Sequence, residues 1–124
     1  MIKEAYVSFE IAKLLKEKEF DEDCYTFYEY NNKEFYREER IPCCNSRSDD
    51  YAAPTHQMAI AWLREVYGLY IWVDYSRLDC NEKQPYLWNI VETKVDGDYW
   101  GGTYNKYAKN AVEAALKYCL ENLI

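Results

Sequence analysis

The sequence lacks the features of proteins that enter membranes, leave the cell or bind nucleic acid. No window approaches the roughly 18 uninterrupted apolar residues of a membrane-spanning helix. Lys3 and Glu4 bring charge to a position where a signal peptide needs an apolar stretch. Lys and Arg total 15 against 22 Asp and Glu, and the resulting net charge of −7 repels a phosphate backbone. We therefore expect a cytoplasmic protein without direct contact to nucleic acid or membranes.

Motifs specific to a chemistry are missing as well. The sequence contains no P-loop, no dinucleotide-binding fingerprint and no nucleophile elbow, and the pair Gly101-Gly102 is too weak a signal on its own. The acidic run at residues 19–23 lacks the alternating ligands and the turn glycine of a calcium loop. Cys43 and Cys44 are adjacent, which does not fit the two-to-four-residue spacing of structural zinc ligands. We expect no metal ion and no cofactor.

The cysteines are odd in number and occur without a secretory context, which indicates reduced thiols. All five are predicted to be free: Cys24, Cys43, Cys44, Cys80 and Cys119. Cys119 falls on the apolar face of the last predicted helix and should be buried.

The length and the apolar content are those of one compact folded domain over residues 1–124. Apolar residues at helical spacing, with Ser8, Thr55 and Asn105 as caps, predict helices near 8–18, 55–67 and 105–122. Aromatic and β-branched runs predict strands near 24–30, 33–37, 69–77 and 86–94, with turns at Asn31-Asn32, Asn81–Pro85 and Asp96-Gly97. The order α-β-β-α-β-β-α predicts an α+β fold with a mainly antiparallel sheet of about four strands packed with three helices.

One core should collect the apolar faces of these elements. We assign to it the side chains of Ile11, Leu15, Trp62, Leu63, Val66, Ile71, Val73, Ile90, Ala115 and Leu116.

Three helical stretches carry a resemblance to a known family: residues 5–18, residues 53–59 together with Trp62-Leu63-Arg64-Glu65, and residues 111–118. They resemble a family of small uncharacterised proteins of gut bacteria of the Bacteroides group and of their phages and mobile elements. Similar sequences often carry a glycine after the first helix, where this chain has Glu19. The resemblance implies a cytoplasmic protein of mobile-element type and transfers no activity.

Aromatic residues are in excess, with 14 tyrosines in 124 residues. A sheet of about four strands offers too little inner face to cover them all, and exposed Tyr and Trp are typical of recognition surfaces. The residues predicted to bind are Tyr28, Tyr30, Trp72, Tyr75, Tyr99, Trp100 and, at the start of the second helix, His56. The prediction is a protein-binding or regulatory module without catalysis, acting through a protein partner or by self-association. The alternative is that helices of the same chain cover both faces of the sheet.

Two other functions stay open. Cys43 or Cys44 could act as a nucleophile with His56 as the base and Asp49 or Asp50 as its orienting carboxylate. An acidic protein could also imitate a phosphate array and act as a decoy for nucleic-acid-binding proteins. The N-terminus of the helix beginning near Thr55 could further attract an anion, as any helix start can.

Overall fold

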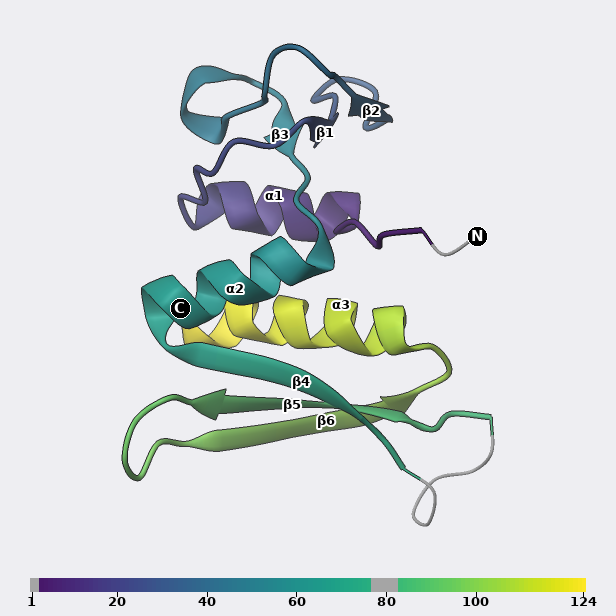
Figure 1. Cartoon of the computed structure of the whole chain (residues 1–124), viewed down its shortest axis with the longest axis vertical. Helices are drawn as coiled ribbons and strands as arrows, with labels where there is room; N and C mark the ends of the chain where they lie inside the picture. Colours follow the sequence, from purple (N-terminus) through teal and green to yellow (C-terminus); the bar gives the residue numbers. More distant parts are fainter. Residues whose placement is uncertain (1–2, 77–82) are drawn as a thin grey trace. The chain divides into compact units, whose positions relative to one another are not determined.

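The structure is a computed structural model that describes residues 3–76 and 83–124. Its internal contacts divide the chain into two compact units, Met1–His56 and Gln57–Ile124. The predicted α+β class is confirmed, and all strand pairs are antiparallel. Each predicted hairpin gains a third strand, so that two three-stranded sheets take the place of one sheet of about four (Figure 1).

The N-terminal unit consists of one helix and a small sheet. Helix α1 spans Phe9–Glu17, and the strands are β1 at Thr26–Tyr28, β2 at Phe35–Arg37 and β3 at Tyr51–Ala52, in the order β2-β1-β3. The Ser8 side chain accepts a hydrogen bond from the backbone N–H of Ile11, as predicted for a cap. The chain turns at the predicted Asn31-Asn32, and the residue with positive φ between β1 and β2 is Lys33.

Helix α1 ends in a Schellman motif built without glycine. The N–H of Phe20 donates to the carbonyl of Leu15 at 2.9 Å, and the N–H of Glu19 donates to that of Lys16 at 3.1 Å. This arrangement requires a left-handed residue, and Glu19 supplies it with φ of 65°. The helix therefore ends in a conformation that favours glycine, although this chain has a residue for which that conformation is strained.

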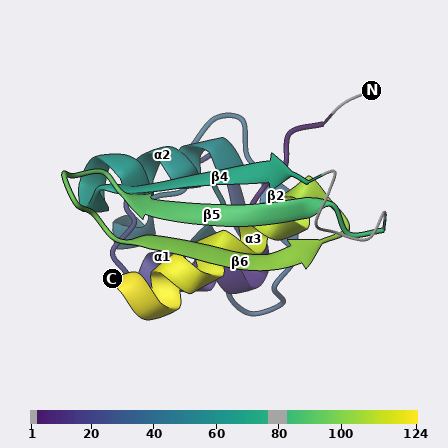
Figure 2. The same cartoon turned by 90° about the horizontal axis from the view of Figure 1, so that it is seen from below.

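The C-terminal unit packs two helices on a larger sheet. Helix α2 spans His56–Tyr67, β4 Leu69–Tyr75, β5 Tyr86–Glu92, β6 Tyr99–Asn105 and α3 Ala108–Tyr118, which continues as the π-helical turn η2 at Cys119–Leu123. The strand order is β4-β5-β6. Helices α2 and α3 lie on the same side of this sheet, and no described element of this unit lies on its other side (Figures 1 and 2).

Strand β6 is not among the strands predicted from the sequence. Trp100, Gly101 and Gly102 continue the strand, and the predicted cap Asn105 is its last residue. The following helix begins only at Ala108, after Tyr107, whose side chain makes no capping hydrogen bond. Asn105 is thus wrong as a helix cap, because its backbone pairs with β5 opposite Tyr86.

Nearly all of the predicted core residues are buried in their own unit. Ile11 and Leu15 are buried in the first unit, and in the second so are Trp62, Leu63, Ile71, Ile90, Ala115 and Leu116. Val73 is half-buried. The assignment of Val66 is wrong, since this side chain is 57% exposed near the end of α2. Val66 belongs to the apolar stripe of α2, but the fold buries only part of that stripe.

The cysteine predictions agree with the structure as far as it reaches. Cys24, Cys43, Cys44 and Cys119 are free thiols, and Cys119 is fully buried as expected. Cys80 lies outside the described residues, as do Arg77 at the end of a predicted strand and the first two residues of the predicted turn at 81–85.

Candidate functional site

The side of the β4-β5-β6 sheet opposite α2 and α3 concentrates aromatic and polar side chains. Trp88 on β5 contacts the Tyr118 ring of α3 at 5.3 Å between centroids, so even-numbered β5 residues face α3. The register then places the odd residues of β5 on the opposite side, with the even residues of β4 and with Tyr99 and Gly101 of β6. We call this side the outer face: Tyr70, Trp72, Asp74, Leu87, Asn89, Val91, Tyr99, Gly101 and, opposite Leu87, Tyr104.

Three rings run across the outer face. The ring centroids of Tyr70 and Trp72 are 5.9 Å apart, and those of Trp72 and Tyr99 are 6.1 Å apart. Trp72 lies on β4 and Tyr99 on β6, so their contact spans the intervening strand β5. Tyr70 remains 40% exposed and Tyr99 57% exposed. The row therefore combines rigid packing with solvent-accessible ring surface.

Asn89 lies beneath this row. It is directly paired with Trp72 on one side and Gly101 on the other, and it is only 1% exposed. Its Oδ1 accepts a short hydrogen bond from the Tyr99 hydroxyl, and its Nδ2 donates to Asp74 Oδ2 at 3.0 Å. A buried amide with both ends bonded fixes the groups around it. Asn89 thereby holds the Tyr99 ring and the Asp74 carboxylate in place.

Gly101 makes room for this arrangement. A Cβ atom at position 101 would lie 3.3 Å from the Tyr99 hydroxyl oxygen, tighter than an ordinary contact. The missing side chain lets the Tyr99 ring lean over the strand towards Asn89. A glycine inside a strand often marks such a close approach.

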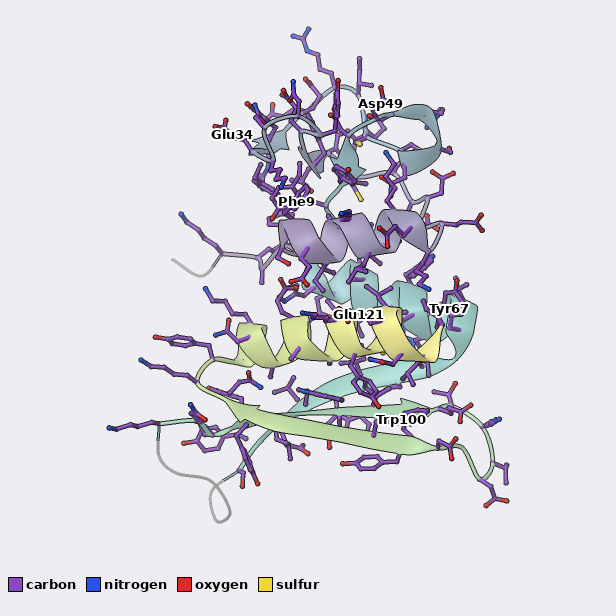
Figure 3. All side chains as sticks on the ribbon, turned by 180° about the vertical axis from the view of Figure 1, so that it is seen from behind. Phe9, Glu34, Asp49, Tyr67, Trp100 and Glu121 are labelled. Carbon is purple, nitrogen blue, oxygen red and sulfur yellow. The ribbon has the colours of Figure 1, made fainter. Side chains whose placement is uncertain are left out.

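The structure separates the residues predicted to bind. It brings Trp72 and Tyr99 together on the outer face. Trp100 pairs with the buried Ile90 and so lies on the α3 side of the sheet, where Figure 3 labels it. Tyr75 pairs with Tyr86 and shares the α3 side of the sheet with Ile71 and Val73, although it is largely exposed near the strand end.

The other three predicted residues belong to the N-terminal unit. Tyr28 donates its hydroxyl to the Val7 carbonyl at 2.7 Å and contacts the rings of Phe9 and Phe35, so it is engaged in packing. His56 is buried, and its backbone N–H donates to the Ala5 carbonyl. Tyr30 is exposed and belongs to the N-terminal unit, whereas the outer-face residues belong to the C-terminal unit.

Sequence reasoning missed Tyr70, Asp74 and Asn89. Tyr70 and Asp74 stand two residues on either side of Trp72, and strand alternation alone could have placed them on its face. Asn89 carries no such signal, because an asparagine inside an apolar run does not reveal which side chains it will bond.

The cysteine–histidine arrangement does not assemble. Cys44 Sγ donates to Asp21 Oδ1 at 2.8 Å and lies 3.4 Å from the Ser46 hydroxyl. Burial raises the pKa of the Cys43 thiol, which disfavours the nucleophilic thiolate. In the described part of the chain, neither thiol has His56 among its contacts.

Of the two aspartates proposed for that site, Asp50 lines a pocket together with Cys43 and Cys44. Asp49 is exposed (Figure 3), and Asp50 Oδ1 accepts a hydrogen bond from the backbone N–H of Tyr30 at 3.2 Å. Within residues 3–76 and 83–124, no group of three or more His, Cys, Asp or Glu side chains could hold a metal ion.

Helices of the described ranges are all too short or too polar to cross a bilayer. Comparison of the chain with models of known protein families, with curated proteins and with solved structures gave no match.

Proposed function

We propose that this chain is a small protein-binding or regulatory module and that the outer face is its recognition surface. The observation that carries the proposal is the row of contacting rings of Tyr70, Trp72 and Tyr99, held over the buried Asn89 on the side of the sheet opposite α2 and α3. Ring surface that is rigid before binding loses little conformational entropy when a partner covers it.

The polar groups of the outer face indicate the partner's chemistry. Asp74 is exposed and carries the negative charge of the face, and the Tyr70 hydroxyl has no partner among the described residues. A protein surface with apolar side chains and a nearby Lys or Arg would satisfy both groups. The chain's net charge of −7 would also steer such a basic partner towards it.

The setting of this module is part of the proposal. Buried free thiols are consistent with a reducing cytoplasm. The resemblance of the three helical stretches supports an origin in a mobile element or phage of gut bacteria.

Affinity capture with matched variants tests the recognition surface. The tagged wild-type chain is compared with a double variant, Tyr70→Thr with Trp72→Thr, which keeps β-branched residues in β4 and leaves the Tyr99–Asn89 bond in place. The control is Tyr107→Thr, because Tyr107 is 50% exposed and lies outside the outer face. Far-UV circular dichroism checks that all three are folded.

The expected result is a host protein that binds the wild type and the Tyr107 variant with equal affinity and the double variant at least tenfold more weakly. Equal retention by the double variant would refute the proposal, as would the failure of any protein to bind specifically.

A further inference from the structure

Strand β4 presents an open hydrogen-bonding edge. It is the first strand in the order β4-β5-β6, and in the described ranges only β5 pairs with it. Two bonds flank the pairing: Thr93 N–H donates to the Gly68 carbonyl, and Ser76 N–H to that of Pro85, each at 2.8 Å. In an antiparallel pair, bonded residues alternate. The even-numbered β4 residues therefore bond β5, and the odd-numbered ones point their N–H and C=O groups outward.

This edge lacks the features by which proteins block further pairing. The strand Leu69–Tyr75 contains neither proline nor lysine, its register with β5 is continuous over seven pairs, and Asp74 is its one charged residue. A long, regular and apolar edge is a template for another strand. The opposite edge, β6, is less suited, because its pairing with β5 is shifted near Leu87 and it contains two adjacent glycines.

We propose that a second copy of this chain occupies the edge, with β4 pairing antiparallel to β4 about a twofold axis at Trp72. This inference goes beyond the proposed function and does not depend on it, because the edge offers backbone groups and the outer face offers side chains. A twofold interface needs a surface that complements itself, and the β4 edge meets this requirement in three ways.

The first is the hydrogen-bond pattern. With the axis at Trp72, all seven residues of each β4 find a partner, and Leu69 faces Tyr75 while Ile71 faces Val73 of the second copy. These are the residues whose backbone groups point outward. Four of them on each copy, each donating and accepting once, give about eight intermolecular hydrogen bonds. Any other twofold register leaves strand ends unpaired.

The second is the contact between side chains on the outer face. Trp72 faces Trp72 of the second copy at a non-hydrogen-bonded position, where Cα atoms are only about 4.5 Å apart. Aromatic pairs at such positions are among the favourable cross-strand contacts. The outer faces of both copies would join into one aromatic surface on a six-stranded sheet.

The third is charge. Asp74 faces Tyr70 of the second copy, so no like charges oppose each other. The two Asp74 residues are offset by four positions, which is about 13 Å along the strands and exceeds the Debye length of about 8 Å at physiological salt.

Exposed apolar residues beside the edge add an independent observation. Val66 is 57% exposed and Tyr67 41% exposed in the last turn of α2, directly before β4 begins. The end of α2 lies at the start of β4, which follows it after a short turn (Figure 1). These side chains lie at the strand's start, where a second copy would cover apolar surface.

The test uses one position with two substitutions. Val73→Pro removes an outward N–H without touching the ladder to β5, and proline is tolerated at such edge positions. Val73→Thr keeps the N–H and the branched shape and serves as the control. Sedimentation equilibrium should show a dimer for the wild type and the Thr variant, and a dissociation constant at least tenfold higher for the Pro variant.

Amide hydrogen exchange of the wild-type chain supplies a second readout that does not rely on any variant. Exchange of the amides of Leu69, Ile71, Val73 and Tyr75 should slow as the protein concentration rises, while that of Tyr70, Trp72 and Asp74 should be slow throughout. A wild-type chain that stays monomeric at millimolar concentration refutes the dimer and leaves the outer-face proposal standing. A dimer whose outward amides exchange freely, or that survives Val73→Pro unchanged, refutes pairing through β4.

Discussion

Replacing Glu19 by glycine should stabilise the chain, although it removes a charged side chain and adds backbone freedom. Glu19 holds φ of 65° at the end of α1, and two backbone hydrogen bonds of the Schellman motif depend on that conformation. The side chain is exposed and makes no hydrogen bond or ion pair among the described contacts. The substitution therefore changes the backbone preference and little else.

The magnitude follows from two opposing contributions. A non-glycine residue in the left-handed region costs about 1–2 kcal/mol, and glycine would relieve that cost. Glycine also has more freedom in the unfolded chain, which costs about 0.5–1 kcal/mol on folding. The net gain is about 0.5–1 kcal/mol in the free energy of unfolding, or a rise of about 2–4 °C in Tm for a chain of this size.

Urea denaturation followed by circular dichroism measures this difference, with Glu19→Ala as the control. Alanine removes the same carboxylate but keeps the Cβ atom and its strain, so it should leave the midpoint within experimental error of the wild type. Equal midpoints for the Gly and Ala variants would refute the reasoning, because the effect would then come from the lost charge. A lower midpoint for Gly would show that the strain at Glu19 is negligible.

Three further perturbations have defined outcomes. Gly102→Ala should destabilise the chain by about 1–3 kcal/mol or more in urea denaturation, because its Cβ would lie 1.6 Å from the Trp88 ring. Tyr99→Phe should cost about 1–2 kcal/mol, since it leaves the buried Oδ1 of Asn89 without its donor. Burial raises the pKa of Cys119 from 9.0 to about 12, so the unfolded state ionises first. The free energy of unfolding should therefore fall as pH rises from 9 towards 12, less steeply in Cys119→Ala.

Each of these has a matched control. Gly101→Ala tests the neighbouring glycine, whose Cβ would meet only the Tyr99 hydroxyl at 3.3 Å, and it should cost much less than the change at 102. A Tyr107→Phe variant, which removes an exposed hydroxyl, should match the wild type in stability. For the thiol, parallel pH profiles of the wild type and the Cys119 variant would contradict the assigned role of burial. In that comparison, other alkaline titrations cancel because both proteins share them.

The sequence by itself determined the fold class and the main elements. Apolar periodicity located all three helices to within a few residues, and runs of aromatic and β-branched residues located β1, β2, β4 and β5, since both patterns are local along the chain. The cap at Ser8 and the burial of Cys119 followed from the same local reasoning. Alternation within one strand also places Trp72 on the side opposite Ile71 and Val73.

Only the tertiary structure decided the rest. Gly101-Gly102 resembles a bend in sequence, yet pairing with β5 makes it a strand, with Trp100 on the α3 side and Tyr99 on the outer face. The burial of Asn89 depends on rings from two other strands closing over it, and the exposure of Val66 depends on how much of α2 its surroundings cover. These outcomes are set by contacts between residues far apart in the chain, and no spacing within a single segment encodes which segment will be the neighbour.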